Sequence, residues 1–160
     1  MGDSNNILIG AATVSVGGSD VGFTSGGTTV RYEPEVRDIM ADQALGVVRK
    51  VRTAERLYVV TTFLESTLEN LRKAFMVPAA NLAGSTLTLG YHQASFVDEL
   101  AIILVGSAPG NGTRTFTFNK CVSLNSKEIA LSREEETAYE VEFEVLKTGT
   151  PLRFGTIVDT

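Results

Sequence analysis

The segment 134–147 constrains the fold most, because its side chains alternate strictly between two kinds from 139 to 145. Alternate positions are acidic on one side and apolar on the other: Glu140, Glu142 and Glu144 against Tyr139, Val141, Phe143 and Val145. Successive side chains of a β-strand point to opposite faces of a sheet, so this spacing predicts a half-buried strand. The chain must therefore build a sheet that has one face on a core.

The composition extends this expectation to the whole chain. Its 160 residues suit a single domain covering 1–160, and 43% hydrophobic residues are enough for one buried core. Fifteen glycines, four prolines and no tryptophan favour strands and turns over a helical fold. The sequence predicts a mainly β fold, either a β-sandwich or an open barrel.

Eight segments have strand character, and turn residues separate most of them. The predicted strands are 7–16, 28–36, 45–52, 56–64, 86–91, 100–105, 113–124 and 134–147. The polar link 53–55 is expected to close a hairpin between two of these strands. A second turn is expected at 109–112, where Pro, Gly, Asn and Gly follow one another.

The segment 33–46 has no clean period of two or of 3.6, which is typical of a surface segment. Its polar residues are Glu33, Arg37, Asp38, Asp42 and Gln43. We expect an arm or a long loop here. The ends of the chain, 1–6 and 148–160, are expected to be flexible.

One flanking α-helix is predicted to begin at Ser66, which together with Glu69 has the spacing of a capping box. The apolar residues that share one face of this helix are Leu64, Leu68, Leu71 and Phe75. The polar residues expected to point away from the sheet are Glu69, Asn70, Arg72 and Lys73.

Catalytic, cofactor and metal chemistry find little support in the sequence. The single cysteine, Cys121, lies in an apolar run, and the single histidine, His92, cannot supply a cluster of imidazole ligands. The glycine-rich segment 106–113 lacks the lysine of a phosphate-binding loop. We therefore expect no enzyme activity, no cofactor and no metal.

The formal charge of −5 opposes nonspecific attachment to nucleic acid or to anionic lipid. No apolar run is long enough to cross a bilayer, so no membrane partner is expected. The acidic face of 134–147 has two interpretations. It is either a solvated outer face or, if it turned inward in a ring, a channel wall to which DNA does not adhere.

Three short motifs in the first half of the chain resemble the tail tube (major tail) proteins of long-tailed phages and related prophage elements. The first is a turn with Val21, Gly22, Phe23, Thr24, Gly26, Gly27, Thr28, Thr29 and Val30. The second is a loop with Glu33, Asp38, Asp42, Gln43 and Gly46, and the third is a helix start with Leu64, Glu65, Thr67, Leu68, Glu69, Asn70 and Leu71. The second half agrees with that family in strand content rather than in motifs.

The resemblance implies a non-enzymatic virion protein that assembles in the host cytoplasm into stacked hexameric rings. Strands of every subunit would form one multi-subunit β-barrel around a channel for the tape measure protein and double-stranded DNA, without specific DNA binding. Its other partners would be tail-tip and terminator proteins. In this view 33–46 links subunits or rings, the chain termini order on assembly, and Glu140, Glu142 and Glu144 line the lumen.

Two alternatives stay open. One is a monomeric or dimeric β-sandwich that binds a ligand or carbohydrate, although the aromatic residues fall mostly on positions that suit a core or interface. The other is a tail terminator protein, which is related in fold. Within the tail tube interpretation, contractile and non-contractile tails also remain undistinguished.

Overall fold

A computed structural model describes residues 10–43, 45–90, 97–123, 127–131 and 136–160. The fold is mainly β with one α-helix in this part of the chain, as predicted. The strands are β1 (Thr13–Val16), β2 (Ser19–Asp20), β3 (Thr24–Met40), β4 (Val47–Phe63), β5 (Leu82–Ala83), β6 (Thr86–Leu87), β7 (Leu100–Ala108), β8 (Gly112–Val122), β9 (Tyr139–Val145) and β10 (Gly155–Asp159). The helix α1 spans Leu68–Ala74, and short 3-10 turns occur at Ala79–Asn81 and Pro109–Asn111.

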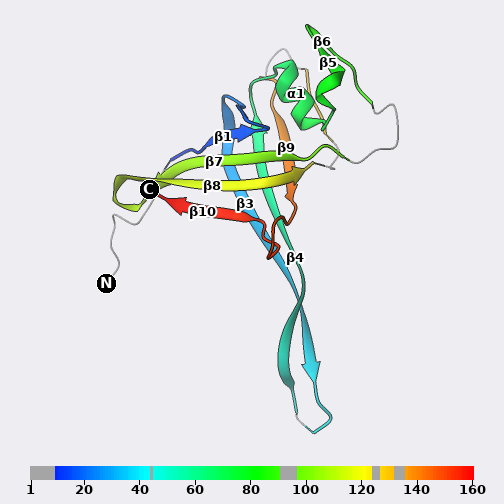
Figure 1. Cartoon of the computed structure of the whole chain (residues 1–160), viewed down its shortest axis with the longest axis vertical. Helices are drawn as coiled ribbons and strands as arrows, with labels where there is room; N and C mark the ends of the chain where they lie inside the picture. The colour runs from blue at the N-terminus through cyan, green and yellow to red at the C-terminus, as the bar shows by residue number, and fades with distance from the viewer. Residues whose placement is uncertain (1–9, 44, 91–96, 124–126, 132–135) are drawn as a thin grey trace.

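Eight of the strands form one antiparallel sheet. Seven of them follow the order β2-β1-β7-β8-β9-β4-β3, and the eighth, β10, pairs with β8 as a branch of this order. The sheet folds over, so that β3, β4 and β9 cross behind β1, β7 and β8 (Figure 1). Among the described residues, β2 pairs only with β1 and β3 pairs only with β4. The sheet is therefore open and does not close into a barrel within one chain.

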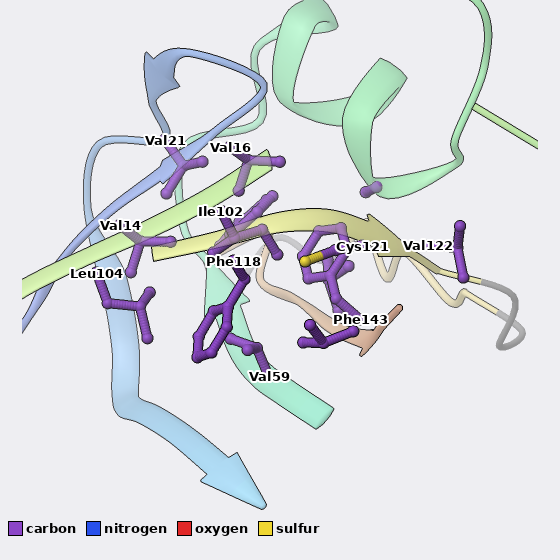
Figure 2. Close-up of a cluster of buried hydrophobic side chains, with 14 of the residues drawn as sticks. Val14, Val16, Val21, Val59, Ile102, Leu104, Phe118, Cys121, Val122 and Phe143 are labelled. Carbon is purple, nitrogen blue, oxygen red and sulfur yellow. The ribbon is translucent and has the colours of Figure 1, made fainter. Parts of the chain in front are cut away.

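The core lies between the two halves of the folded sheet. Val59 on β4 and Phe143 on β9 point toward Ile102 on β7 and Phe118 on β8 (Figure 2). All four side chains are at most 3% exposed. Burial of these side chains is the main favourable contribution to the stability of the domain.

The alternation in β9 is confirmed. Its apolar residues Tyr139, Val141, Phe143 and Val145 are all buried. Glu140 is exposed, and Glu142 and Glu144 are half-buried on the other face of the strand. The observed strand is shorter than the predicted 134–147, and 134–135 of that prediction lie outside the described residues.

Part of the segment 148–160, which is expected to be flexible, forms the strand β10 in the structure. β10 pairs with β8 from Arg114 to Phe118. It uses the same edge of β8 that pairs with β9 farther along, at Cys121 and Val122. The Arg114 guanidinium donates two hydrogen bonds of 2.7 Å to the Asp159 carboxylate. The other predicted flexible end, 1–6, lies outside the described residues.

The segment 33–46 projects from the domain, but it is not a loop. β3 continues to Met40, and its partner β4 runs without interruption from Val47 to Phe63. The turn of the hairpin therefore lies at 41–46 rather than at 53–55. The register shifts there because Glu35 pairs with Ala54 and Val36 with Arg52, so Thr53 forms a bulge and not a turn.

The helix begins one residue later than predicted, and its most buried residues are mainly polar, while Leu71 of the predicted apolar face is only partly buried against the core. Thr67, not Ser66, is the N-cap, and its hydroxyl accepts a 3.1 Å hydrogen bond from the Asn70 backbone. Glu69 does not complete a capping box with Ser66, because its carboxylate accepts hydrogen bonds from Arg72. The buried helix residues are Asn70, Arg72, Lys73 and Ala74, whereas Leu68 is 36% exposed.

Hydrogen-bond partners in distant segments explain why polar residues of the helix are buried. The Asn70 amide donates to the Val21 carbonyl at 2.8 Å, and the Lys73 ammonium donates to Ser19 Oγ at 2.6 Å. A helix of only seven residues has a small apolar face, so such hydrogen bonds decide its orientation.

Candidate functional site: a projecting hairpin arm

The most distinctive feature of the molecule is the distal part of the β3–β4 hairpin. β9 pairs with β4 only from Tyr58 to Phe63, so beyond this point β3 and β4 pair only with each other among the described residues. We call residues 33–56 the arm. Figure 1 shows it extending away from the rest of the domain as a twisted two-stranded ribbon.

The arm exposes many large apolar side chains. They are Val36, Ile39, Met40, Leu45, Val47, Val48 and Val51, with exposed fractions from 39% to 110%. A two-stranded ribbon has only marginal stability in water by itself, and contiguous exposed apolar surface marks interaction sites in soluble proteins. The arm is therefore the candidate interaction surface of the described residues.

The two strands of the arm differ in charge. Residues 33–40 of β3 contain three carboxylates and one arginine, a net charge of −2, whereas residues 47–56 of β4 contain four basic groups and one carboxylate, a net charge of +3. Within the hairpin, Lys50 Nζ lies 2.8 Å from Asp38 Oδ1. Arg37 and Arg49 form no ion pair with another described residue.

A polar cluster holds the base of the arm against the domain. The Glu55 carboxylate accepts hydrogen bonds from the Tyr32 hydroxyl at 2.5 Å and from Arg52 Nη1 at 3.1 Å. It also lies 2.5 Å from Lys147 Nζ, which in turn lies 5.1 Å from the centre of the Phe154 ring. Hydrogen bonds from Lys147 and then from Tyr32 lower the pKa of Glu55 to about 2.

The sequence patterns did not identify this cluster, because its members come from β3, β4 and the segment after β9. The hydrogen bond to the Glu55 carboxylate raises the pKa of the Tyr32 hydroxyl. A hydrogen bond to an ionised carboxylate is stronger than one between neutral groups. The cluster therefore links both strands of the arm to the segment that follows β9.

The acidic face of β9 adjoins the base of the arm. Glu140, Glu142 and Glu144 are cross-strand neighbours of β4 residues, and Glu142 accepts a 3.2 Å hydrogen bond from Arg31. The Arg31 guanidinium also lies 2.8 Å from Glu33 and 4.8 Å from the centre of the Tyr58 ring. The acidic face is thus partly neutralised at its centre.

The predicted arm residues occupy two different places. Glu33, Arg37 and Asp38 lie on β3, and Asp42 and Gln43 lie in the turn at the tip. Of the three glutamates of β9, Glu142 forms an ion pair with Arg31, whose guanidinium also pairs with Glu33 at the base of the arm. The structure therefore brings the acidic face and the base of the arm together, while the tip stands apart.

The described residues hold no group of three or more His, Cys, Asp or Glu side chains that could bind a metal ion. Cys121 is buried, and burial raises the pKa of its thiol to about 12. A thiol with this pKa is a poor nucleophile at neutral pH. His92 lies outside the described residues.

In the part of the chain that the structure describes, none of the helices is long and apolar enough to cross a membrane. No protein-family model matches the sequence, and a comparison with curated proteins gives no match either.

Proposed function

We propose that this protein is the structural subunit of a phage tail tube, which polymerises as stacked hexameric rings. The tube would conduct the tape measure protein and then double-stranded DNA. The observation that carries the proposal is the arm, a long ribbon with exposed apolar side chains at the edge of an open sheet. Large exposed apolar patches on soluble proteins mark interaction sites.

The open sheet supports the same proposal. β3 is an edge strand of 17 residues, and a long free edge invites pairing with another chain. Neighbouring copies that pair through their edges would convert the open sheet into a barrel shared by the ring. Head-to-tail contacts around a rotation axis close such a ring.

We further propose that Glu140, Glu142 and Glu144 face the channel. Carboxylates repel the phosphates of DNA, so a wall of this kind lets DNA pass without binding. The arm would contact a neighbouring subunit or the next ring.

The first test is negative-stain electron microscopy of the purified protein at increasing concentration. We expect rings with sixfold end views and hollow tubes. A variant in which Asn-Gly replaces residues 36–53 keeps the Glu35 and Ala54 pair next to a two-residue turn. It should fold and remain small. If the parent chain also remains small at every concentration, the tube proposal is contradicted and the ligand-binding module takes its place.

The position of the acidic face is tested with Glu140→Cys. The natural Cys121 is buried, so the new thiol is the reactive one. In tubes, a small maleimide should label this position rapidly, whereas a maleimide on a large polymer should label it only in the unassembled protein. Equal labelling of tubes by both reagents would place this face outside.

A further inference from the structure

The arm has two free edges, and they carry opposite charge. β3 has β4 on one side and no described partner on the other. β4 pairs with β9 only from Tyr58 onward, so its distal part from Val47 to Leu57 is also free on one side. The backbone N–H and C=O groups along both edges are available for a further strand.

We propose that the arms of adjacent copies pair edge to edge, the acidic β3 edge of one arm with the basic β4 edge of the next. This inference rests on the proposed function only in that the partner is a second copy of the chain. It adds the surfaces that meet, the direction of the contact and the force that selects it.

Charge selects this pairing over the alternatives. Two β3 edges would bring two segments of net charge −2 together, and two β4 edges would bring two segments of net charge +3 together. Like charges on adjacent strands destabilise a sheet, and opposite charges stabilise it. Only the unlike edges attract each other, so the contact is heterologous.

Strand direction makes the contact repeatable. β3 and β4 are antiparallel within the hairpin. If the β3 edge of a second copy adds to β4 in antiparallel orientation, the second arm points the same way as the first. It then presents its own basic β4 edge to a third copy. Repeated head-to-tail contacts close into a ring when the rotation from copy to copy divides a full turn.

Arg49 has a charge that its own hairpin leaves without an ion-pair partner in the described part of the chain. It lies on the basic β4 edge opposite Ile39. In the proposed contact, Arg49 faces the acidic β3 strand of the neighbour. The apolar side chains of the arm, among them Ile39 and Val51, would be covered at the same time.

The test uses two single-cysteine variants, Ile39→Cys on β3 and Val51→Cys on β4. Both positions are exposed and apolar, so the charges of the arm stay unchanged. They share one face, because Ile39 and Arg37 are two residues apart and Arg37 pairs with Val51. A bismaleimide that spans about 10 Å, roughly three residue steps along a strand, tolerates any nearby register.

The two variants carry different affinity tags and are cross-linked alone and mixed, with the parent chain as control because its Cys121 is buried. We expect cross-linked dimers of unlike chains in about tenfold excess over dimers of like chains. Adding Arg49→Glu to the Val51→Cys variant should reduce the yield by about the same factor, whereas Arg49→Lys should not.

Dimers formed by either variant alone as readily as in the mixture would overturn the proposal, because they show pairing of like edges. Electron microscopy of the same samples separates the two claims. Tubes that give no unlike dimers contradict the edge pairing and leave the tube function intact. Unlike dimers without tubes support the pairing and contradict the tube, and the absence of both refutes both.

Discussion

The Glu55 carboxylate lies 2.5 Å from the ammonium of Lys147, which belongs to the segment that follows β9. This ion pair joins the base of the arm to the segment that follows β9, the neighbour of β4 in the sheet, and the Tyr32 hydroxyl adds a hydrogen bond from β3. These polar contacts tie the base of the arm to the sheet, from which β3 and β4 continue outward.

The first prediction concerns the pH dependence of this contact. Lys147 and then Tyr32 lower the pKa of Glu55 from 4.5 to about 2. A carboxyl group whose pKa is lowered by folding stabilises the native state above its unfolded pKa, and this contribution is lost as the pH falls through the folded pKa. We expect Glu55→Gln to flatten the fall in stability between pH 5 and pH 2.

Urea unfolding at several pH values measures this effect. Glu140→Gln is the matched control, because it also removes one carboxylate but from an exposed position on β9. The control should retain the pH dependence of the parent chain. If Glu55→Gln retains it as well, the contact with Lys147 does not contribute to stability.

The second prediction concerns the two faces of β9. Phe143 is fully buried, so Phe143→Ala should lower the free energy of unfolding by about 3–5 kcal/mol. Glu140→Gln, on the other face, should change it by no more than about 0.5 kcal/mol. Chemical denaturation checks both variants. Equal effects would mean that the strand does not separate a core face from a solvent face.

Local patterns explain which parts of the fold were predictable. The alternation of β9 depends only on neighbours in the sequence, so its two faces were correctly predicted. The hairpin depends on pairing between β3 and β4, and no local pattern shows that Thr53 is a bulge within a longer strand. Because the arm and the cluster around Glu55 depend on the same nonlocal pairing, local sequence patterns could not predict either of them.

The helix shows a second reason why sequence patterns did not predict part of the structure. Periodicity assigns polar residues to the outside, but Lys73 and Asn70 are buried because Ser19 and Val21 supply hydrogen-bond acceptors. These acceptors lie in β2 and just after it, far from the helix in sequence. A buried polar residue is stable only when such partners are present, and the sequence of the helix does not reveal them.

The third prediction concerns Lys73, whose side chain is fully buried. Burial lowers the pKa of its ammonium group below 10.5. The native state then binds fewer protons than the unfolded state between the two pKa values, so this residue makes stability rise with pH in that range. Both Lys73→Met and Lys73→Ala should abolish this rise.

The two variants should lower the free energy of unfolding by different amounts. Lys73→Ala leaves a cavity and should lower the free energy of unfolding by about 2–5 kcal/mol. Lys73→Met keeps most of the volume and removes a buried charge, so its cost should stay below about 1.5 kcal/mol. Urea unfolding at pH 7 and pH 10 tests both points. An equal cost for the two variants would show that the hydrogen bond to Ser19, and not packing, dominates.

The last prediction concerns the docking of β10. A Cβ atom on Gly155 would lie 2.1 Å from the Thr117 carbonyl oxygen and 2.8 Å from the Phe118 ring, so Gly155→Ala should displace β10 from β8. Trypsin should then cleave after Arg153 about tenfold faster, because local opening exposes the chain. Gly106→Ala is the control, since its Cβ would meet nothing closer than 3.8 Å. If both variants are cleaved at the parent rate, the close contact between β10 and β8 does not hold the C-terminal strand in place.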